Sequence, residues 1–442
     1  MTDQNYRVAV IGAGPAGLFA ARELAKNGAE VSLFNRDIKP GGLAEYGIYP
    51  DKHAMKDALR NQFRQILETA NIFYFGNLRV GQNGDLTLQD LRDLGYQAVL
   101  VTVGAQGTKK LGLPGEDLPG VYHAKDLVFH YNALPPYSQR PYPFGKRVAV
   151  VGAGNVMMDI ARFLVQKGRV QEVCAIVRRG PMEVKFDKKE TEELALNIDP
   201  DAFDAEVARI GEGMRAVGQD PAQARAFIDA ALPNAHPTGS NTRFRFRFLS
   251  SPAGILGDEG GVRALLVDDT ELTLRDGQVG VRQSGRQSEL PFDNVVFAIG
   301  DTVDESFGLP LEKGEYAKNP NPAYPQENTS FEAFDPATGT ALDGIFVAGW
   351  ARQASTGLVG YARKDGTLAA RAVLQYLQGK EPLPSVQPRL QQRLIRLTKT
   401  VVTNSDILKL DVIERDMAAE KGLRSFKFGS NQEMLEKIMS IG

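Results

Sequence analysis

The chain has 442 residues, of which 24% are charged and 43% hydrophobic, and its formal net charge is −2. This length suggests about two to three domains with a sizeable buried core, and the balanced charge argues against a general nucleic-acid binder. The first residues lack the pattern of a secretory signal, and no apolar run approaches the ~20 residues that cross a bilayer, so we expect a soluble, cytoplasmic protein.

The first predicted elements are a strand, a glycine turn, a helix and a second strand. The strands span 8–11 and 31–34 and the helix begins after the sequence GAGPAG, which makes a βαβ unit with a parallel sheet. Gly12 permits the tight turn, Gly14 lets the backbone approach a pyrophosphate, and Gly17 lets helix and strand pack closely. The start of the helix adds free N–H groups that attract phosphate. This placement of the motif predicts a dinucleotide site.

The end of the second strand carries the position that normally holds the ribose. An acidic side chain is usual about twenty residues after the turn, but Asn35 stands there, followed by Arg36. Asparagine can hydrogen-bond a ribose without the charge-assisted strength of a carboxylate. Arg36 leaves open the alternative that this first site binds a 2′-phosphate.

A second copy of the same pattern follows later in the chain. An apolar strand at 98–105 closes the first region, and a proline-rich connector at 134–145 leads into a second βαβ unit at 147–177. Gly152 and Gly154 repeat the first two glycines of the turn. We therefore predict a second dinucleotide site.

The second turn differs from the first in its other residues. Asn155 and Met157 replace Pro15 and Gly17, and a methionine there would either push the helix away from the strand or lean toward the ligand. The following strand ends in an arginine pair, Arg178 and Arg179, where a 2′-phosphate would lie. Because guanidinium groups suit phosphate in both geometry and charge, this site is predicted to prefer NADP(H) over NAD(H). The alternative is that these two arginines simply lie at an exposed strand end and bind no phosphate.

Two further regions contain regularly spaced arginines. A polar helical excursion is predicted over 188–235, and an alternating strand with arginines on one face and phenylalanines on the other follows it. A basic amphipathic helix is predicted near 389–397. Both arginine sets are either solvated faces or docking groups for an acidic partner: Arg243, Arg245 and Arg247 on the strand, and Arg389, Arg393 and Arg396 on the helix.

The single cysteine restricts the chemistry. Cys174 lies in an apolar run and is predicted to be a buried strand residue. One cysteine excludes an internal redox dithiol and an iron–sulfur cluster held by this chain. The four histidines have no zinc-like spacing, so we expect no metal site. Redox chemistry must therefore come from a bound organic cofactor, and two dinucleotide sites suggest a resident flavin and a visiting nicotinamide.

The chain resembles adrenodoxin reductase and its bacterial relatives, the flavin-dependent ferredoxin–NADP reductases of the glutathione-reductase-like superfamily. The resemblance covers nearly the whole chain and is carried by the joint order of these motifs: GGLAEYGIYPD (41–51), GNLRVG (76–81), LPGEDLPGVYHAKDLVFHYNALP (113–135), GAGNVMMDIAR (152–162), RRGPMEVKF (178–186), RFLSSP (247–252), GWARQASTG (349–357) and NQEMLEKI near the C-terminus. Many other members of the superfamily have aspartate where Trp350 follows the glycine, so this tryptophan favours the adrenodoxin reductase group.

The resemblance implies bound FAD and NADP(H) and assigns site residues by position. The FAD contacts it implies are Gly12, Gly14, Pro15, Ala16, Gly17, Asn35, Arg36, Gly42, Leu43, Val80, Gly104, Gly349, Trp350, Gly357, Leu358 and Val359. The NADP(H) contacts are Gly152, Gly154, Asn155, Val156, Arg178, Arg179 and Glu190, with Gly357 near the nicotinamide. The candidate catalytic residues are Lys52, His53, Asp159 and Trp350.

The sequence departs from the family pattern at three positions. Asn35 replaces a glutamate, Met157 replaces a small residue, and Lys52 replaces a histidine near the flavin, with His53 one place later. Lys52 or His53 is expected either to take over a proton-relay or electrostatic role or to be a surface residue. Asp159 matches an acidic residue of the family.

These observations predict an α/β protein with two Rossmann-like domains, the NADP domain being inserted in a discontinuous FAD domain. The expected boundaries are 1–108 and 304–442 for FAD, with a C-terminal helical tail, and 109–303 for NADP, with a helical insertion at about 188–236. The predicted activity is transfer of hydride from NADPH to FAD and then of single electrons to a ferredoxin-type iron–sulfur protein or a flavodoxin. The alternatives are a small-molecule or quinone reductase, and a flavin-binding subunit with impaired nicotinamide use.

Overall fold

The computed structural model describes residues 6–354 and 359–440, and the chain divides into two compact units. Unit 1 consists of residues 1–108, 129–139 and 301–442, and unit 2 of residues 109–128 and 140–300. The α/β fold with one unit inserted in a discontinuous other is therefore confirmed. Residues 129–139, which the sequence assigns to the central domain, belong to unit 1, where Phe129 and Leu134 are buried beside Tyr46.

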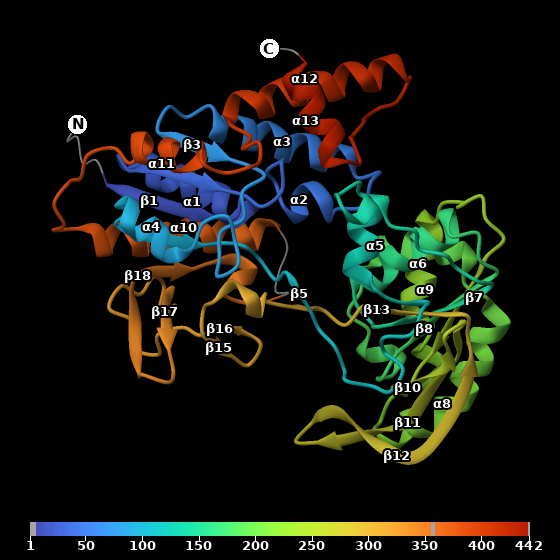
Figure 1. Cartoon of the computed structure of the whole chain (residues 1–442). Helices are drawn as coiled ribbons and strands as arrows, with labels where there is room; N and C mark the ends of the chain where they lie inside the picture. Colours follow the sequence, from blue (N-terminus) through green and yellow to red (C-terminus); the bar gives the residue numbers. More distant parts are fainter. Residues whose placement is uncertain (1–5, 355–358, 441–442) are drawn as a thin grey trace. The chain divides into compact units, whose positions relative to one another are not determined.

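Unit 1 is built on a six-stranded sheet with the strand order β17-β18-β4-β1-β2-β3 (Figure 1). Neighbouring strands are parallel except for the antiparallel pair β17 and β18 at one edge. The strands are β1 (Arg7–Ile11), β2 (Glu30–Phe34), β3 (Ile72–Phe75), β4 (Ala98–Val101), β17 (Glu332–Asp335) and β18 (Thr340–Val347). The predicted strand at 98–105 thus ends at Val101, where the chain turns away from the sheet.

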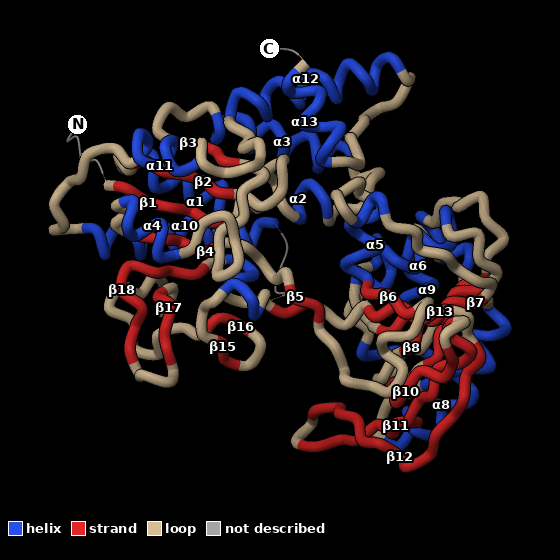
Figure 2. Tube along the Cα trace, in the orientation of Figure 1, coloured by secondary structure: helices blue, strands red, loops and turns tan. Residues whose placement is uncertain are grey.

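Helices cover both faces of this sheet because side chains alternate along its strands. Val8 and Val10 of β1 point into one core, and Ala9 and Ile11 point into the other. The first face is covered by α1 (Pro15–Lys26), α3 (His53–Leu67), α10 (Val359–Leu377), α12 (Asn404–Glu420) and α13 (Asn431–Met439). The second face is covered mainly by α4 (Leu88–Leu94) and α11 (Gln387–Leu394). Figure 2 shows the helices of unit 1 in blue around the red strands of the sheet.

Unit 2 is built on a five-stranded parallel sheet with the order β6-β13-β7-β8-β9. One face packs on a three-stranded antiparallel sheet through a core that includes the buried Cys174. The elements are β6 (Val121–His123), β7 (Arg147–Val151), β8 (Glu172–Ile176), β9 (Arg243–Arg247), β13 (Asn294–Phe297), the antiparallel strands β10 (Ser250–Asp258), β11 (Gly261–Arg275) and β12 (Gln278–Pro291), and the helices α6 (Asn155–Lys167), α7 (Lys188–Glu192), α8 (Pro200–Ala216) and α9 (Ala226–Ala231). The predicted helical excursion and alternating strand are both present.

Helices α1 and α10 of unit 1 approach each other so closely that one contact excludes a side chain. A Cβ at Gly366 of α10 would lie 2.1 Å from the carbonyl oxygen of Ala16 in the first turn of α1. Separations below about 3 Å do not occur between a Cβ and a backbone atom, so the two helices would have to move apart. This contact fixes α10 against the helix that follows the first glycine turn.

We expect Gly366→Ala to destabilise unit 1 by about 3 kcal/mol, because the added methyl group overpacks the contact between the two helices. The measurement is the thermal unfolding transition. The control is Gly213→Ala on α8, where the nearest atom to the new Cβ, in the Leu249 side chain, lies 3.9 Å away. This variant should be neutral or up to about 1 kcal/mol more stable, because alanine favours helix over glycine. Equal transitions for both variants would contradict the close contact.

Candidate functional site

The first glycine turn combines two crowded positions with one open position. Gly12 has a φ of +105°, and a Cβ there would lie 2.5 Å from the Thr102 carbonyl oxygen. A Cβ at Gly17 would lie 1.9 Å from the Gly12 carbonyl oxygen, so α1 packs directly on the turn. In contrast, no described atom lies within 4 Å of a Cβ placed at Gly14. The backbone at Gly14 is therefore open to a ligand.

The start of α1 is also available to a ligand. Gly14 is the N-cap residue, no side chain caps the helix, and Pro15 occupies the first turn. The first N–H groups of a helix lack intrahelical partners and carry partial positive charge. An open glycine before an uncapped helix start fits the pyrophosphate of a dinucleotide.

Three other segments of unit 1 meet this turn. Gly42 approaches Gly14, since a Cβ at Gly42 would lie 3.0 Å from the Gly14 Cα. Gly349 lies against Ala16 of α1, where a Cβ would come within 2.7 Å of the Ala16 Cβ. The Thr102 hydroxyl donates to the carbonyl of Gly12 at 2.7 Å. The structure thus brings together predicted residues that are up to 337 positions apart (349 minus 12).

Asn35 is buried and its side chain organises the loop around it. Its Oδ1 accepts from the Ala13 N–H at 3.1 Å, and its Nδ2 donates to the carbonyls of Asp37 at 2.9 Å and Lys39 at 3.0 Å. The amide group is therefore engaged by the protein, so its observed role is to hold the glycine turn. The Arg36 guanidinium forms an ion pair with Asp37 at 3.0 Å, which raises the pKa of Arg36 and neutralises the charge that a 2′-phosphate would need.

The other predicted residues of unit 1 lie at the ends of its elements. Leu43 is the first residue of α2 (Leu43–Tyr46), Lys52 is the N-cap of α3 and His53 its first residue. Val80 is buried, Gly104 has a φ of +73° beyond β4, and Trp350 directly follows Gly349. Val359 is the first described residue of α10, whereas Gly357 and Leu358 lie outside the described residues.

The second glycine turn repeats this open arrangement in unit 2. A Cβ at Gly152 would lie 2.5 Å from the Ala298 carbonyl oxygen, whereas no described atom lies within 4 Å of a Cβ at Gly154. Gly154 is the N-cap of α6 and no side chain caps that helix. The side chain of Asn155 exchanges two hydrogen bonds with Asp187, at 2.7 and 2.8 Å, and Val156 is exposed at the helix start.

Met157 faces the interior of the protein rather than a ligand. Its relative exposure is 0%, and its neighbours Met158 and Ile160 on α6 are also buried. The Met158 N–H donates to the Gly154 carbonyl at 3.4 Å, which is the i to i−4 bond of an α-helix, so the helix begins directly after the turn. The interpretation that Met157 leans toward the ligand is therefore wrong, because the side chain fills the core beneath the helix.

Arg178 and Arg179 differ from the other arginines that the sequence singles out in unit 2. Within residues 6–354 and 359–440, neither of their guanidinium groups forms a hydrogen bond or an ion pair. By contrast, each arginine of β9 pairs with an acid: Arg243 and Arg245 with Glu172, and Arg247 with Asp269. Two uncompensated guanidiniums just beyond β8 are suited to bind an anion. Glu190 lies on α7 and Asp159 on α6.

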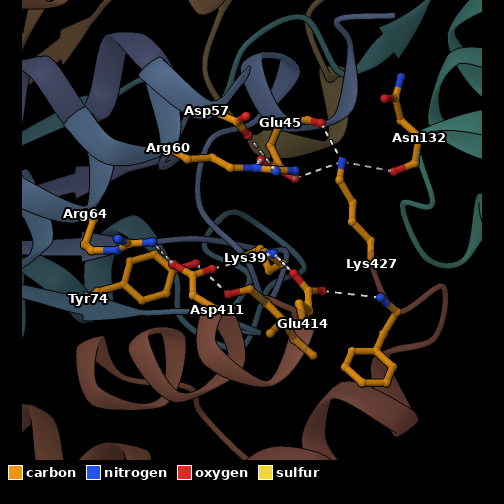
Figure 3. Close-up of polar contacts among 12 residues, drawn as sticks. Lys39, Glu45, Asp57, Arg60, Arg64, Tyr74, Asn132, Asp411, Glu414 and Lys427 are labelled. Carbon is orange, nitrogen blue, oxygen red and sulfur yellow. Dashed lines mark hydrogen bonds and ion pairs between the residues drawn. The ribbon is translucent and has the colours of Figure 1, made fainter. Parts of the chain in front are cut away.

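A buried charge network holds the loop around Gly41 and Gly42 in unit 1 (Figure 3). Glu45, only 3% exposed, receives two hydrogen bonds from Arg60 at 2.8 and 2.6 Å and pairs with Lys427 at 2.8 Å. Burial alone would raise the pKa of the Glu45 carboxyl, but Lys427, Arg60 and Lys39 hold it well below its usual range. Lys39 in turn pairs with Glu414 of α12. The C-terminal helices are thereby anchored to the loop that precedes α3.

Lys56 is the most unusual titratable group near this network. It is 4% exposed, its Nζ donates to the Asn132 side-chain oxygen at 2.7 Å, and among the described residues it has no acidic partner. Burial, with the charge of Lys427, lowers the pKa of Lys56 to about 7. The sequence draws attention to Lys52 and His53, whereas the buried lysine lies one helical turn further along α3.

Several residues that shape the site give little signal in the sequence. Thr102, Glu45 and Lys427 act through contacts between distant segments, which no local pattern predicts. Asp365 is the exception, because a carboxylate on the apolar side of α10 indicates a buried partner. It binds Arg352 and the N–H of Gly349.

Comparisons with known proteins support a nucleotide-dependent oxidoreductase. The sequence profile of the pyridine nucleotide-disulphide oxidoreductase family matches residues 6–349. The NADPH-ferredoxin reductase FprA of Mycobacterium leprae is 28% identical over 97% of this chain and 98% of its own length. The mitochondrial NADPH:adrenodoxin oxidoreductase of Bos taurus is 28% identical over 99% of this chain and 92% of its own length.

The solved structure of Mycobacterium tuberculosis FprA in complex with NADPH is similar in fold as well as in sequence. It matches with a TM-score of 0.80 and 28% identity, covering 98% of this chain and 100% of the other. The similarity therefore extends through both units and the C-terminal helices.

We expect Lys427→Met to destabilise the protein by about 3 kcal/mol, because it removes one cation from the buried Glu45 carboxylate. Chemical denaturation of the native and variant proteins measures the difference. The control is Lys364→Met, which breaks a 2.6 Å ion pair with Glu327 whose two side chains are 64% and 57% exposed. That change should stay within about 0.5 kcal/mol. A similar loss of unfolding free energy in the two variants would contradict the claim that the buried ion pair contributes more than the exposed one.

The lowered pKa of Lys56 predicts a pH-dependent stability. Between pH 7 and its unfolded value near 10.5, Lys56 is protonated only in the unfolded chain, so stability rises with pH. Below pH 7 the free-energy cost of burying the Lys56 charge lowers the stability in full. This cost falls as the pH rises from 7 toward 10.5. Relative to Lys56→Met, the native protein should therefore gain stability from pH 7 to pH 10, as measured by urea unfolding. Exposed Lys26→Met is the control, and an identical pH profile for both variants would refute the shift.

Proposed function

Because the chain belongs to the pyridine nucleotide-disulphide oxidoreductase family, we propose that it is an FAD-dependent NADPH:ferredoxin oxidoreductase. The resemblance to the adrenodoxin reductase group is confirmed by the near full-length similarity to two kinds of NADPH-dependent reductase. The observation that carries the proposal is the pair of open glycine turns on two separate sheets, of which only the second is followed by uncompensated arginines.

Unit 1 holds the flavin in this proposal. Gly14 and the start of α1 would bind the pyrophosphate, and Gly42, Leu43 and Trp350, which the family resemblance assigns to FAD, would complete the site. Bound FAD supplies the chemistry of accepting a hydride and releasing its two electrons singly. The protein residues would hold and orient it.

Unit 2 binds NADPH in this proposal. The start of α6 at Gly154 receives the pyrophosphate, and Arg178 and Arg179 receive the 2′-phosphate. Arg36 is not assigned this role, because Asp37 already neutralises it. The uncompensated arginine pair therefore accounts for selection of NADPH over NADH.

The electron acceptor is a ferredoxin-type iron–sulfur protein, with flavodoxin as the alternative one-electron carrier. Acidic acceptors require free cations on the reductase, and the arginines of β9 are compensated by neighbouring acids. Arg393 of α11 also pairs with Asp90, at 3.1 Å. A docking role for either arginine set remains a prediction.

In the described parts of the chain, no helix is long and apolar enough to cross a membrane. A cytoplasmic location remains a prediction of the sequence. The alternative of a subunit with impaired nicotinamide use loses one of its two sequence arguments, because Met157 is buried in the core of unit 2.

Anaerobic stopped-flow mixing of the FAD-loaded protein with NADPH or NADH tests the proposal. We expect NADPH to bleach the visible flavin band, NADH to do so much more weakly, and a reduced ferredoxin to appear when the oxidised carrier is added. Bleaching by neither nucleotide would overturn the proposal.

The arginine pair is tested in the same assay with Arg178→Gln/Arg179→Gln. Loss of charge-assisted phosphate contacts should weaken NADPH binding about tenfold or more and leave NADH little changed. The control is Arg263→Gln/Arg282→Gln, which removes the same charge from exposed pairs with Glu289 and Glu271. Equal loss in both double variants would indicate a general charge effect.

A further inference from the structure

The turn that carries Trp350 is fastened to the middle of the following helix by a buried carboxylate. Asp365 of α10 is 4% exposed, and its Oδ2 accepts from the Gly349 N–H at 2.6 Å. Its Oδ1 accepts from the Arg352 Nη2 at 2.5 Å, and the Arg352 Nε contacts both oxygens at 3.1 and 3.2 Å. One side chain therefore holds both ends of the short 349–352 turn.

The same turn is held from its other side by a second charged pair. The Lys318 Nζ donates to the Arg352 carbonyl at 2.7 Å and pairs with Glu315 at 2.5 Å. The Glu315 Oε1 accepts from the Ala354 N–H at 3.0 Å. The Arg352 guanidinium also lies 5.0 Å from the centre of the Phe331 ring. The guanidinium is thus fixed by a salt bridge and by an aromatic face.

The 349–352 turn packs too closely on α1 to shift toward the first glycine turn. Gly349 has a φ of +65°, and its Cα approaches Ala16 so closely that a Cβ would lie 2.7 Å from the Ala16 Cβ. Gly366, the residue after Asp365, packs on the Ala16 carbonyl. Asp365 therefore acts at the point where α1, α10 and the Trp350 turn are in contact.

We propose that Asp365 is a positioning residue of the flavin site, which acts through Gly349 and Arg352 to set the place of Trp350. This inference rests on the proposed function, since it assumes that FAD occupies the site next to this turn. In this proposal the carboxylate itself would not contact the flavin. It would fix the backbone of the 349–352 turn, which carries Trp350.

The test compares Asp365→Asn with Arg371→Gln in the FAD-loaded full chain. Asparagine keeps the size and one oxygen for Gly349 but removes the charge that holds Arg352. Arg371 lies on the same helix and forms an exposed ion pair with Glu23 of α1 at 3.1 Å, so it controls for loss of a contact between these two helices. Arg352→Lys, which keeps a positive charge at the turn, is the milder variant in case Asp365→Asn fails to fold.

Three quantities are measured: the Kd for FAD by fluorescence titration, the midpoint potential by dye equilibration, and the kcat and KM for NADPH. We expect Asp365→Asn to raise the Kd for FAD about tenfold. It should also shift the midpoint potential and reduce kcat with little change in KM. Arg352→Lys should shift the same quantities less, and Arg371→Gln should shift none.

A lower unfolding temperature with unchanged Kd and potential would overturn the inference, because Asp365 would then be structural only. Equal changes in Arg371→Gln would overturn it as well. The proposed function fails separately, when the native FAD-loaded protein is not reduced by NADPH. In that case the FAD titration and the midpoint potential still decide the role of Asp365.

Discussion

The first nucleotide site depends on how closely backbones approach one another around α1. No Cβ fits at Gly17, because it would lie 1.9 Å from the Gly12 carbonyl, and none fits at Gly366, because it would lie 2.1 Å from the Ala16 carbonyl. Through these two contacts, α1 packs directly against the glycine turn that precedes it and against α10. Gly14 and the uncapped helix start remain open, and Gly349, which precedes Trp350, lies against Ala16 in the first turn of α1.

The two glycine turns have the same backbone design but different electrostatic surroundings. The first turn is surrounded by compensated charges: Arg36 pairs with Asp37, and Glu45 is buried among cations. The second is followed by Arg178 and Arg179, which have no acidic partner among the described residues. In the proposed function, this difference assigns the nucleotide with a 2′-phosphate to the second turn and FAD to the first. The backbone conformation of the two glycine turns alone would not distinguish the two sites.

Much of the fold and the location of both glycine turns could be predicted from the sequence, because they depend on local patterns. Apolar strands, glycine spacing and helix periodicity identify both βαβ units within a few residues. The sequence could not predict that the Asn35 side chain is hydrogen-bonded to the glycine turn, or that Met157 is buried in the core of unit 2. Nor could it pair Glu45 with Lys427, which is 382 positions away. Such contacts are determined by tertiary packing, and no local sequence pattern encodes them.

A crystal structure of the protein with FAD and NADP+ bound tests the assignment of the two sites most directly. We expect the FAD pyrophosphate at Gly14 with its ring beside Trp350, and the 2′-phosphate of NADP+ between Arg178 and Arg179. FAD on the Gly154 turn, or the 2′-phosphate at Arg36, would contradict the assignment.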